Sequence, residues 1–332
     1  MAVNLRGPIH TQQGDMDNIL ILGGSGFVGS VLCETLVRRA RGAGRITVPS
    51  RRIAHVKHLQ TLPTIEVIQA DVHDDAQLAC LVAGRDAVVN LVAILHGNQA
   101  DFERAHVALP GRLARACLAA GVPRVVHVSA LGADAKAPSM YLRTKAAGEA
   151  ALQEPGMAVT VLRPSVIFGS GDSFLNLFAR LQAVFPVMPL AGAGARFQPV
   201  WVDDVAEAIG RALDDPTTAG QTLECTGPRV YTLAELVRLA GCWSGHERPV
   251  FSLPDALGRL QARMMELLPG EPLMSLDNVR SMQVPNIASG HRPGLEQLGI
   301  EATALEAIGP GMLAADGEVA RLNRWRAAVH SE

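Results

Sequence analysis

The sequence predicts an α/β protein, built as a doubly wound parallel sheet with a smaller C-terminal α/β lobe. Short β-branched runs alternate with longer helical patterns from Asn18 to about Ser165, and this alternation is typical of right-handed βαβ units. A glycine-rich turn directly follows the first apolar run. The alternation breaks at the glycine-rich turn of residues 168–172, where we expect the second lobe to begin.

Six apolar runs in the first part of the chain are expected to be strands. Each is short and almost continuously apolar, which is typical of strands that are covered on both faces. They occupy residues 18–22, 45–49, 65–70, 86–92, 123–129 and 158–164, and helical patterns fill 27–41, 74–83, 102–120 and 140–153. We therefore expect a sheet domain over 17–165, preceded by a disordered leader over 1–16.

The second lobe, residues 166–332, is expected to be smaller and interleaved with the sheet domain. VDDVAEAIGRALDD (202–215) and TLAELVRLAG (232–241) have helical patterns, whereas QTLEC (221–225) and PVFSL (249–253) are typical of short strands. Residues 254–284 form a helical stretch that contains Met264, Met265, Met274 and Met282. Methionine adapts to irregular apolar shapes, so this stretch indicates either a pocket for a long hydrophobic molecule, such as a quinone, or ordinary core.

Composition and charge exclude several classes of partner. The net charge is −2, the aromatic content is 4% and Lys and Arg are scattered, so we expect no nucleic-acid binding. The five cysteines lie far apart, without metal-ligand spacing, which indicates a reducing compartment and no metal site. No segment has eighteen uninterrupted apolar residues. We expect a cytoplasmic protein, with peripheral association with the inner membrane as an alternative.

The turn LILGGSGFVGSVL carries the first candidate site. It places Gly23, Gly26 and Gly29 between an apolar strand and the start of a helix. Glycines there permit a tight turn and bring backbone N–H groups and the positive helix end against a pyrophosphate. A glycine-rich turn can also simply reverse the chain. In this context the pattern favours a Rossmann dinucleotide-binding domain, with Ser25, Phe27 and Val28 beside the cofactor.

The end of the second strand indicates which dinucleotide binds. An acidic residue at this point would hold a ribose 2′-hydroxyl, but the sequence has Ser50, Arg51 and Arg52. Guanidinium groups suit a 2′-phosphate because they bind it bidentately. NADP(H) is therefore favoured over NAD(H), the alternative being a solvated loop.

The ends of the third and fourth strands complete the expected cofactor crevice. Asp71 and Val72 would meet the adenine, and the fourth strand ends beside the crevice at Asn90, Leu91, Val92 and Ala93. Either group of residues can equally serve to cap a strand end.

Ser129, Tyr141 and Lys145 form the candidate catalytic set. Tyr141 and Lys145 are four residues apart on an expected helix, so they share one face. Ser129 ends the fifth strand. This set suits carbonyl and alcohol chemistry, in which a tyrosine transfers a proton, an ammonium lowers the pKa of that tyrosine and a serine holds the reacting oxygen. The alternative is a set of hydrogen bonds within a filled crevice.

Five motifs together resemble the short-chain dehydrogenase/reductase superfamily: GGSGFVG, HVSALGAD, YLRTKAAGE, LRPSVIFG and PVWVDDVAEAI. The resemblance covers about residues 17–240. Within this superfamily the chain is similar to the atypical, epimerase/dehydratase-like branch related to the NADPH-binding 39 kDa accessory subunit of complex I and its bacterial relatives.

The resemblance implies a role for each motif. The three glycines would bind pyrophosphate, the two arginines the 2′-phosphate and Lys145 the nicotinamide ribose. Ser129 and Tyr141 would face a substrate carbonyl. The sixth strand departs from the pattern, because Pro164 and Ser165 stand where many reductases have Pro-Gly.

Two functions of different classes follow from these observations. The first is an NADP(H)-dependent oxidoreductase or epimerase/dehydratase-type enzyme acting on a carbonyl or alcohol of a hydrophobic, quinone-like substrate. The second is a non-catalytic NADPH-binding accessory protein of respiratory complex I or of quinone biosynthesis, in which the cofactor stabilises the fold. A third, nucleotide-sugar epimerisation, lacks a recognisable signature in the second lobe.

Overall fold

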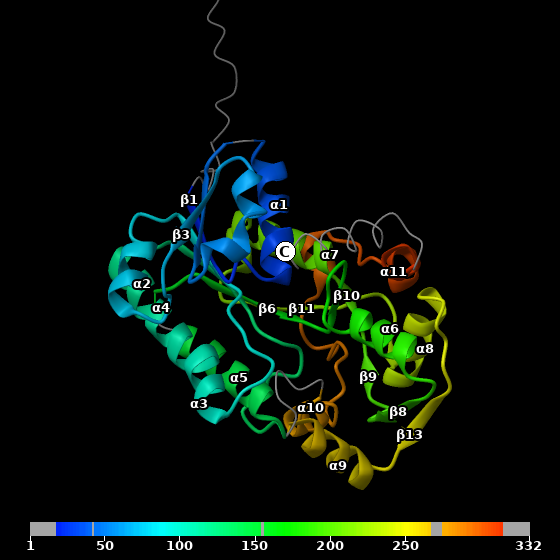
Figure 1. Cartoon of the computed structure of the whole chain (residues 1–332). Coiled ribbons are helices and arrows are strands. Elements are labelled where there is room, and N and C mark those ends of the chain that lie inside the picture. The colour runs from blue at the N-terminus through cyan, green and yellow to red at the C-terminus, as the bar shows by residue number, and fades with distance from the viewer. Residues whose placement is uncertain (1–17, 42, 154–155, 267–273, 315–332) are drawn as a thin grey trace, which may run out of the picture.

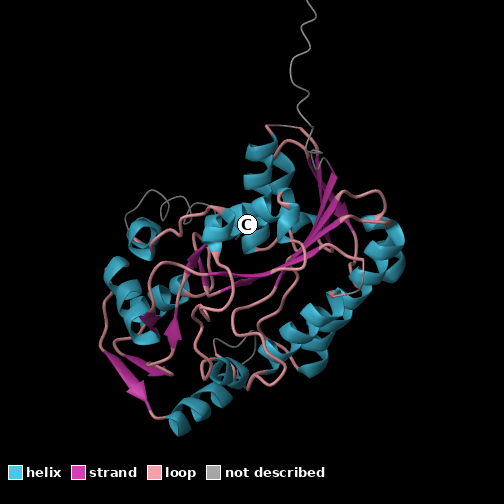
Figure 2. Ribbon diagram, turned by 180° about the vertical axis from the view of Figure 1, so that it is seen from behind, coloured by secondary structure: helices cyan, strands magenta, loops and turns pink. Residues whose placement is uncertain are grey.

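The structure is a computed structural model, and it describes residues 18–41, 43–153, 156–266 and 274–314. Its centre is a seven-stranded sheet in the order β11-β6-β5-β4-β1-β2-β3, and every neighbouring pair is parallel. Helices cover both faces (Figures 1 and 2). The predicted α/β class with a doubly wound parallel sheet is confirmed. The expected leader, residues 1–16, lies outside the described residues.

The six predicted strands all form. They are β1 (Asn18–Leu22), β2 (Arg45–Ser50), β3 (Ile65–Gln69), β4 (Ala87–Asn90), β5 (Arg124–Val128) and β6 (Val159–Pro164). β4 is shorter than expected because the Oδ1 atom of Asn90 accepts the Val92 N–H at 3.2 Å, which ends the regular ladder. Successive side chains of a strand point to opposite faces. In β1, Ile19 and Ile21 accordingly enter one core and Leu20 and Leu22 the other.

Each face of the sheet is covered by helices far apart in sequence. On one face α1 (Phe27–Ala40) packs against α7 (Val202–Asp214), and on the other α2 (Asp75–Val82) and α5 (Met140–Leu152) flank α4 (Leu109–Ala120). Two strongly buried hydrophobic clusters fill the space between these helices and the sheet. Burial on both faces explains why the strand sequences are almost continuously apolar.

The second lobe contributes to the main sheet. The segment Thr222–Cys225 forms β11, which pairs with β6 at the edge of the sheet. Both β11 and α7 lie beyond residue 165, in the part of the chain that was expected to form the second lobe. Leu223 and Cys225 are fully buried. Their side chains pack into the hydrophobic core of the main sheet. The chain thus returns to the first domain after entering the second.

The remaining elements build the second lobe. Its core lies between α6 (Leu175–Val184), α8 (Leu233–Trp243), α11 (Leu305–Leu313) and the parallel pair β8 (Met188–Ala191) and β13 (Val250–Leu253). Short pairs join β7 (Ile167–Phe168) to β10 (Val200–Trp201) and β9 (Arg196–Phe197) to β12 (Tyr231–Thr232). The expected stretch 254–284 contains α9 (Asp255–Glu266) and α10 (Leu276–Ser281). No described helix is long and apolar enough to cross a membrane.

The helix expected over 102–120 is interrupted. It consists of α3 (Gln99–Glu103), a π-helical turn over Arg104–Ala108 and α4. The π turn brings the carbonyl oxygen of His106 against α5, where a Cβ atom on Gly148 would lie 2.0 Å from that oxygen. Only glycine fits at such a contact, so Gly148 sets how closely α5 approaches the π turn.

Replacing Gly148 by alanine tests this packing. Because the added Cβ must displace backbone, we expect Gly148→Ala to lower the free energy of unfolding by about 1–3 kcal/mol. The matched control is Gly111→Ala on α4, where a Cβ would meet the Ala151 Cβ at an ordinary 3.8 Å. Loss of backbone entropy in the unfolded chain should make the control about 0.5–1 kcal/mol more stable. Urea unfolding measures both, and equal stabilities would contradict the steric argument.

Candidate active site

The glycine turn at the end of β1 forms a close-packed cradle. Gly23 has a positive φ of 80° and its carbonyl accepts the Gly26 N–H at 3.0 Å. A Cβ on Gly29 would lie 2.4 Å from that carbonyl oxygen. Ser25 and Gly26 are exposed, Phe27 and Val28 are partly buried, and no side chain caps the start of α1. The first amides of α1 are therefore available to an anion.

Gly24, which sequence analysis did not assign, is also constrained. A Cβ at this position would lie 2.9 Å from the side chain of Val48 in β2. Gly23 in turn faces the end of β4, because its Cβ would lie 3.1 Å from the backbone of Leu91 and Val92. The turn is thus packed between β2 and the end of β4, and these contacts fit the pyrophosphate cradle of a dinucleotide site.

The residues after β2 lie at the same edge of the sheet. Ser50 is partly buried and its Oγ atom accepts the Arg52 N–H at 3.3 Å. Arg51 and Arg52 are exposed, and neither guanidinium makes a hydrogen bond or ion pair with another described residue. Two cationic groups that have no partner in the described part of the chain suit a phosphate ligand.

The ends of β3 and β4 contain local caps. The Oδ1 atom of Asp71 accepts the His73 N–H at 2.9 Å, and Val72 packs against the second core cluster. Asn90 is fully buried. Its side chain binds Val92 N–H, as described above, and its Nδ2 lies 3.2 Å from the Nδ1 atom of His127. Ala93 is exposed.

Lys145 and Ser129 are brought together at the end of β5. The Lys145 side chain is buried, with 2% of its surface exposed, and its Nζ donates to the carbonyl of Val128 at 2.9 Å. Burial lowers the pKa of Lys145 to about 8, opposed by the charge of Glu149. Ser129 follows Val128 directly and is 3% exposed. Its Oγ atom has no hydrogen-bond partner among the described residues.

Tyr141 lies one helical turn before Lys145 on α5 and is half-buried. Its ring packs edge-on against His106, with centroids 5.5 Å apart, and against Phe102 at 6.4 Å. Burial raises the pKa of Tyr141 to about 12. The phenol is therefore protonated at neutral pH.

His106 is a feature that sequence analysis missed. Its Nε2 accepts the Ile94 N–H at 3.0 Å, and its Nδ1 lies 3.0 Å from the Oγ1 atom of Thr144. Burial lowers the pKa of His106 to about 3, and the charge of Lys145 adds to this effect. The neutral ring thus joins the segment after β4 to α5 beside Tyr141. A histidine within an apolar helical pattern gives no signal of such a role.

His127 is a second buried histidine at this site. Its Nε2 atom has no hydrogen-bond partner in the described part of the chain, and burial holds the pKa of His127 well below its ordinary value. Within that same part of the chain, no three His, Cys, Asp or Glu residues are grouped to hold a metal ion.

The second lobe contacts the site through two side chains that sequence analysis did not single out. Asp277 on α10 accepts the N–H groups of Met140 and Tyr141 at 2.7 and 2.9 Å. Asn286 accepts the Ser165 hydroxyl at 2.6 Å through its Oδ1 atom. The Ser165 Oγ atom also accepts the Gln198 N–H at 3.3 Å. The hydroxyl of Ser165 therefore joins the lobes, and Pro164 beside it is buried in β6.

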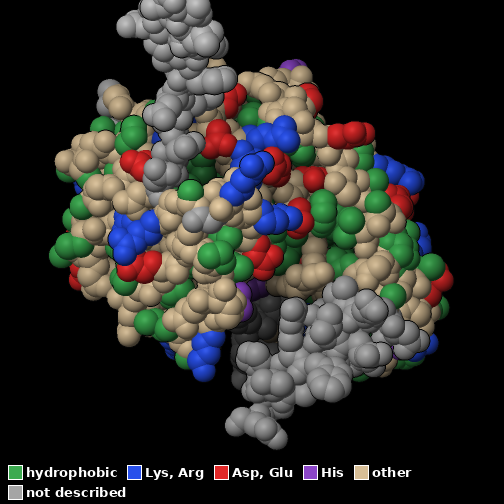
Figure 3. Space-filling model, turned by 90° about the horizontal axis from the view of Figure 1, so that it is seen from above, with side chains coloured by type: hydrophobic (Ala, Val, Ile, Leu, Met, Phe, Trp, Pro, Cys, Tyr) green, Lys and Arg blue, Asp and Glu red, His purple; other side chains and the backbone are tan. Residues whose placement is uncertain are grey.

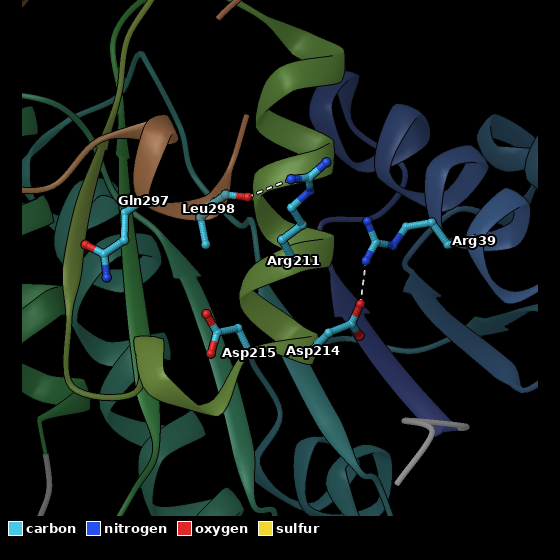
Figure 4. A pocket seen from close by; sticks show the side chains of 6 residues that line it. All are labelled: Arg39, Arg211, Asp214, Asp215, Gln297 and Leu298. Carbon is cyan, nitrogen blue, oxygen red and sulfur yellow. Dashed lines mark hydrogen bonds and ion pairs between the residues drawn. The ribbon is translucent and has the colours of Figure 1, made fainter. Parts of the chain in front are cut away.

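Two pockets lie elsewhere on the surface. One, of 280 Å³, is lined by Arg39, Arg211, Asp214, Asp215, Gln297 and Leu298 (Figure 4). Arg39 is in the last turn of α1, so this pocket is at the opposite end of that helix from the glycine turn. The other, of 420 Å³, is almost entirely apolar and is lined by Leu257, Leu260, Gln261, Met264 and Met265 of α9.

The four methionines therefore have different surroundings. Met264 is exposed and lines the apolar pocket together with Met265. Met282 packs against the core of the second lobe, and Met274 is partly buried. The segment therefore contributes both to an apolar surface pocket and to the core of the second lobe.

The surface charges show no dominant sign on the face seen in Figure 3, where Lys and Arg side chains alternate with Asp and Glu. Arg39 illustrates the pattern, because it forms ion pairs with both Glu207, at 2.6 Å, and Asp214.

Comparison with known proteins gives relatives of two kinds. Subunit 9 of the NADH dehydrogenase (ubiquinone) 1 alpha subcomplex of Mus musculus is 32% identical, over 86% of this chain and 77% of that protein. A ceramide reductase of Caulobacter vibrioides is 28% identical, over 71% and 74%. The structure of an NADPH-dependent quinone oxidoreductase of Escherichia coli, complexed with NADPH, has the same fold. It aligns with a TM-score of 0.71 and 22% identity, over 88% of this chain and 98% of that one.

The family is shown by a match over most of the sheet domain. Residues 19–231 match the family model described as the NAD dependent epimerase/dehydratase family. This range contains the glycine turn, Ser129, Tyr141 and Lys145. The resemblance to short-chain dehydrogenases/reductases and to the complex I subunit is thereby confirmed. The chain belongs to the NAD dependent epimerase/dehydratase family, as an NAD(P)-binding protein of the short-chain dehydrogenase/reductase type.

Proposed function

We propose that the protein is an NADP(H)-dependent oxidoreductase that reduces a carbonyl group of a hydrophobic substrate. The observation that carries the proposal is the buried Lys145 amine, which donates to the carbonyl of Val128 one helical turn from Tyr141. The next residue, Ser129, has a buried hydroxyl with no partner among the described residues. Burying an amine and leaving a hydroxyl without a partner both reduce stability. Such arrangements are typical of sites that are selected for chemistry.

The cofactor would lie along the carboxyl edge of the sheet. The glycine cradle and the first amides of α1 would hold its pyrophosphate, and the exposed Arg51 and Arg52 its 2′-phosphate. When bound, NADPH supplies a hydride. The remaining predicted cofactor residues, at the ends of β3, β4 and β6, would form the walls of its crevice.

Side chains of the protein would donate the proton and bind the substrate oxygen. The Ser129 Oγ would donate a hydrogen bond to the carbonyl oxygen, and the Tyr141 hydroxyl would give that oxygen its proton. A phenol whose pKa is about 12 holds its proton at neutral pH, which favours the direction of reduction. A charged Lys145 would lower the pKa of Tyr141 during the transfer.

The substrate is expected to be hydrophobic. The apolar pocket on α9 supports this class, because it offers Leu257, Leu260 and Met264 to an alkyl chain. Relatives named ceramide reductase and 2-alkyl-3-oxoalkanoate reductase also support it. Epimerase/dehydratase-type chemistry on an alcohol would use the same three residues.

A second candidate function is a non-catalytic NADPH-binding accessory protein. It is favoured by the similarity to the mouse complex I subunit. In this role the protein would associate with a respiratory or quinone-biosynthesis complex, in the cytoplasm or at the inner membrane, and bound NADPH would stabilise the fold.

Removal of the two arginines tests the cofactor assignment. Because charged hydrogen bonds to a phosphate are lost, Arg51→Ala/Arg52→Ala should weaken NADPH binding by about 10- to 100-fold and leave NADH binding unchanged. Isothermal titration with both nucleotides measures this. Arg45→Ala, at the opposite end of β2 and also exposed, should change neither. Equal weakening of NADPH and NADH would contradict the assignment.

Tyr141→Phe separates the two candidate functions. It should abolish carbonyl-dependent NADPH oxidation while NADPH affinity stays within about twofold, since only the proton donor is lost. The control is Tyr231→Phe, at the other tyrosine, which donates to Glu306 at 2.8 Å in the second lobe; this variant should retain turnover. Full activity in Tyr141→Phe would rule Tyr141 out as the proton donor.

Lys145→Met tests the electrostatics of the site without any substrate. Folding lowers the pKa of Lys145 to about 8, so the unfolded chain binds the ammonium proton more tightly than the folded protein does. The resulting loss of stability is therefore complete below pH 8. That penalty fades between pH 8 and about 10.5.

The variant should therefore be about 1–3 kcal/mol more stable than the parent at pH 7, and the gain should shrink as the pH rises through this window. Urea unfolding of the cofactor-free protein gives the difference at each pH. The exposed Lys136→Met is the control and should show no such trend. A gain that is constant from pH 7 to 10.5 would count against the lowered pKa.

A further inference from the structure

We propose that Asp277 is a positioning residue, through which the second lobe fixes the start of α5 and thereby the place of Tyr141. The inference rests on the proposed role of Tyr141 as proton donor. The contacts of Asp277 do not depend on any substrate. One part of the test can therefore be carried out without a substrate.

The carboxylate satisfies the first amides of α5. The Oδ1 atom accepts the Met140 N–H at 2.7 Å and the Oδ2 atom accepts the Tyr141 N–H at 2.9 Å, across 137 and 136 positions of sequence. The first four amides of a helix have no partner within the helix. Ser139 accepts the next one, from Leu142, at 3.2 Å. One end of α5 is therefore held by its own cap and by a residue of the other lobe.

Burial and charge make this contact strong. Asp277 is only 6% exposed, so its two charge-assisted hydrogen bonds are shielded from water. A carboxylate at a helix N-terminus is also favoured by the helix dipole. Because one of the two bonds is made to Tyr141 itself, a displacement of Asp277 moves the backbone that carries the phenol.

Asp277 is itself held by neighbouring elements. The Ser275 hydroxyl caps α10 by accepting the Asn278 N–H at 3.1 Å. Glu266 at the end of α9 accepts the Leu276 N–H at 2.7 Å. α10 contacts both α9 and α5 (Figure 1). The apolar pocket on α9 is thus joined to Tyr141 by one continuous set of contacts.

A second buried carboxylate provides a matched control. Asp204 on α7 is 7% exposed, and it accepts the N–H of Thr303 at 2.7 Å and its hydroxyl at 3.0 Å, across 99 positions. Asp204 thus holds the segment around Thr303 with two hydrogen bonds, as Asp277 holds the start of α5. α7 covers the opposite face of the sheet from α5. Loss of Asp204 therefore removes comparable bonds without touching Tyr141.

The experiment compares Asp277→Asn with Asp204→Asn in full-length protein. The chain has two tyrosines, so fluorotyrosine labelling gives two ¹⁹F NMR resonances, which Tyr231→Phe assigns. In Asp277→Asn, the new amide N–H₂ faces a backbone N–H. We expect the Tyr141 resonance to shift or broaden, whereas Asp204→Asn leaves it in place even when it lowers Tm equally. An unchanged Tyr141 resonance in Asp277→Asn would overturn the proposal.

Kinetics then tests the consequence for catalysis. Misplacing the proton donor should lower kcat in Asp277→Asn by about 10- to 100-fold, with NADPH affinity unchanged, while Asp204→Asn keeps the parent kcat. A shifted resonance with an unchanged kcat also overturns the proposal. If Tyr141→Phe is fully active, the proposed function fails instead, and the NMR comparison alone decides whether Asp277 positions Tyr141.

Met140→Pro covers the case in which Asp277→Asn does not fold. Proline is tolerated at the first position of a helix and lacks the N–H that Asp277 accepts, and the extended Ser139 before it is compatible with proline. This variant should shift the Tyr141 resonance in the same direction as Asp277→Asn but by less, since the bond to Tyr141 remains. No shift would contradict the proposal.

Discussion

The site depends on how α5 is held by the elements around it. Three contacts hold it: Gly148 against the carbonyl of His106 in the π turn, the Lys145 amine on the carbonyl of Val128 in β5, and Asp277 of the second lobe at the helix start. Together they fix the axial position, the rotation and the distance of the helix. A side chain at Gly148 or a shift at its N-terminus would move Tyr141 and Lys145 together, because both project from the same face. The four-residue spacing of Tyr141 and Lys145 places both side chains at the site only because α5 is held in a fixed position.

The same packing creates the electrostatics of the site. An amine buried against one carbonyl loses hydration, and the pKa of Lys145 falls accordingly. Glu149, one turn further on, opposes this shift, but its carboxylate is engaged by Arg163 in a buried ion pair of 2.6 Å. The charge that opposes the lowered pKa of Lys145 is thus itself held in place by a buried contact. Close packing thus sets the charge balance as well as the geometry.

The elements that were predicted correctly are those that a periodic, local sequence pattern determines. All six strands of the first domain and the glycine turn follow from apolar runs and backbone constraints that neighbouring residues determine. The π turn at Arg104–Ala108 was not predicted, because the contact it makes with Gly148 joins segments that are distant in the sequence. Asp277, Asn286 and His106 were missed for the same reason. Each is an ordinary residue in its own segment and becomes part of the site only when distant segments meet.

One relative is named as a subunit of the NADH dehydrogenase (ubiquinone) 1 alpha subcomplex and another as a ceramide reductase, so family membership is compatible with both candidate functions. The buried polar atoms are more informative. The Ser129 hydroxyl and the His127 Nε2 atom are both buried without partners in the described chain, and a buried polar atom that stays unpaired costs about 1–3 kcal/mol. A substrate oxygen beside Tyr141 would give Ser129 its missing partner. Under the proposed oxidoreductase function, the unfavourable burial of Ser129 is the stability lost in exchange for a prepared site.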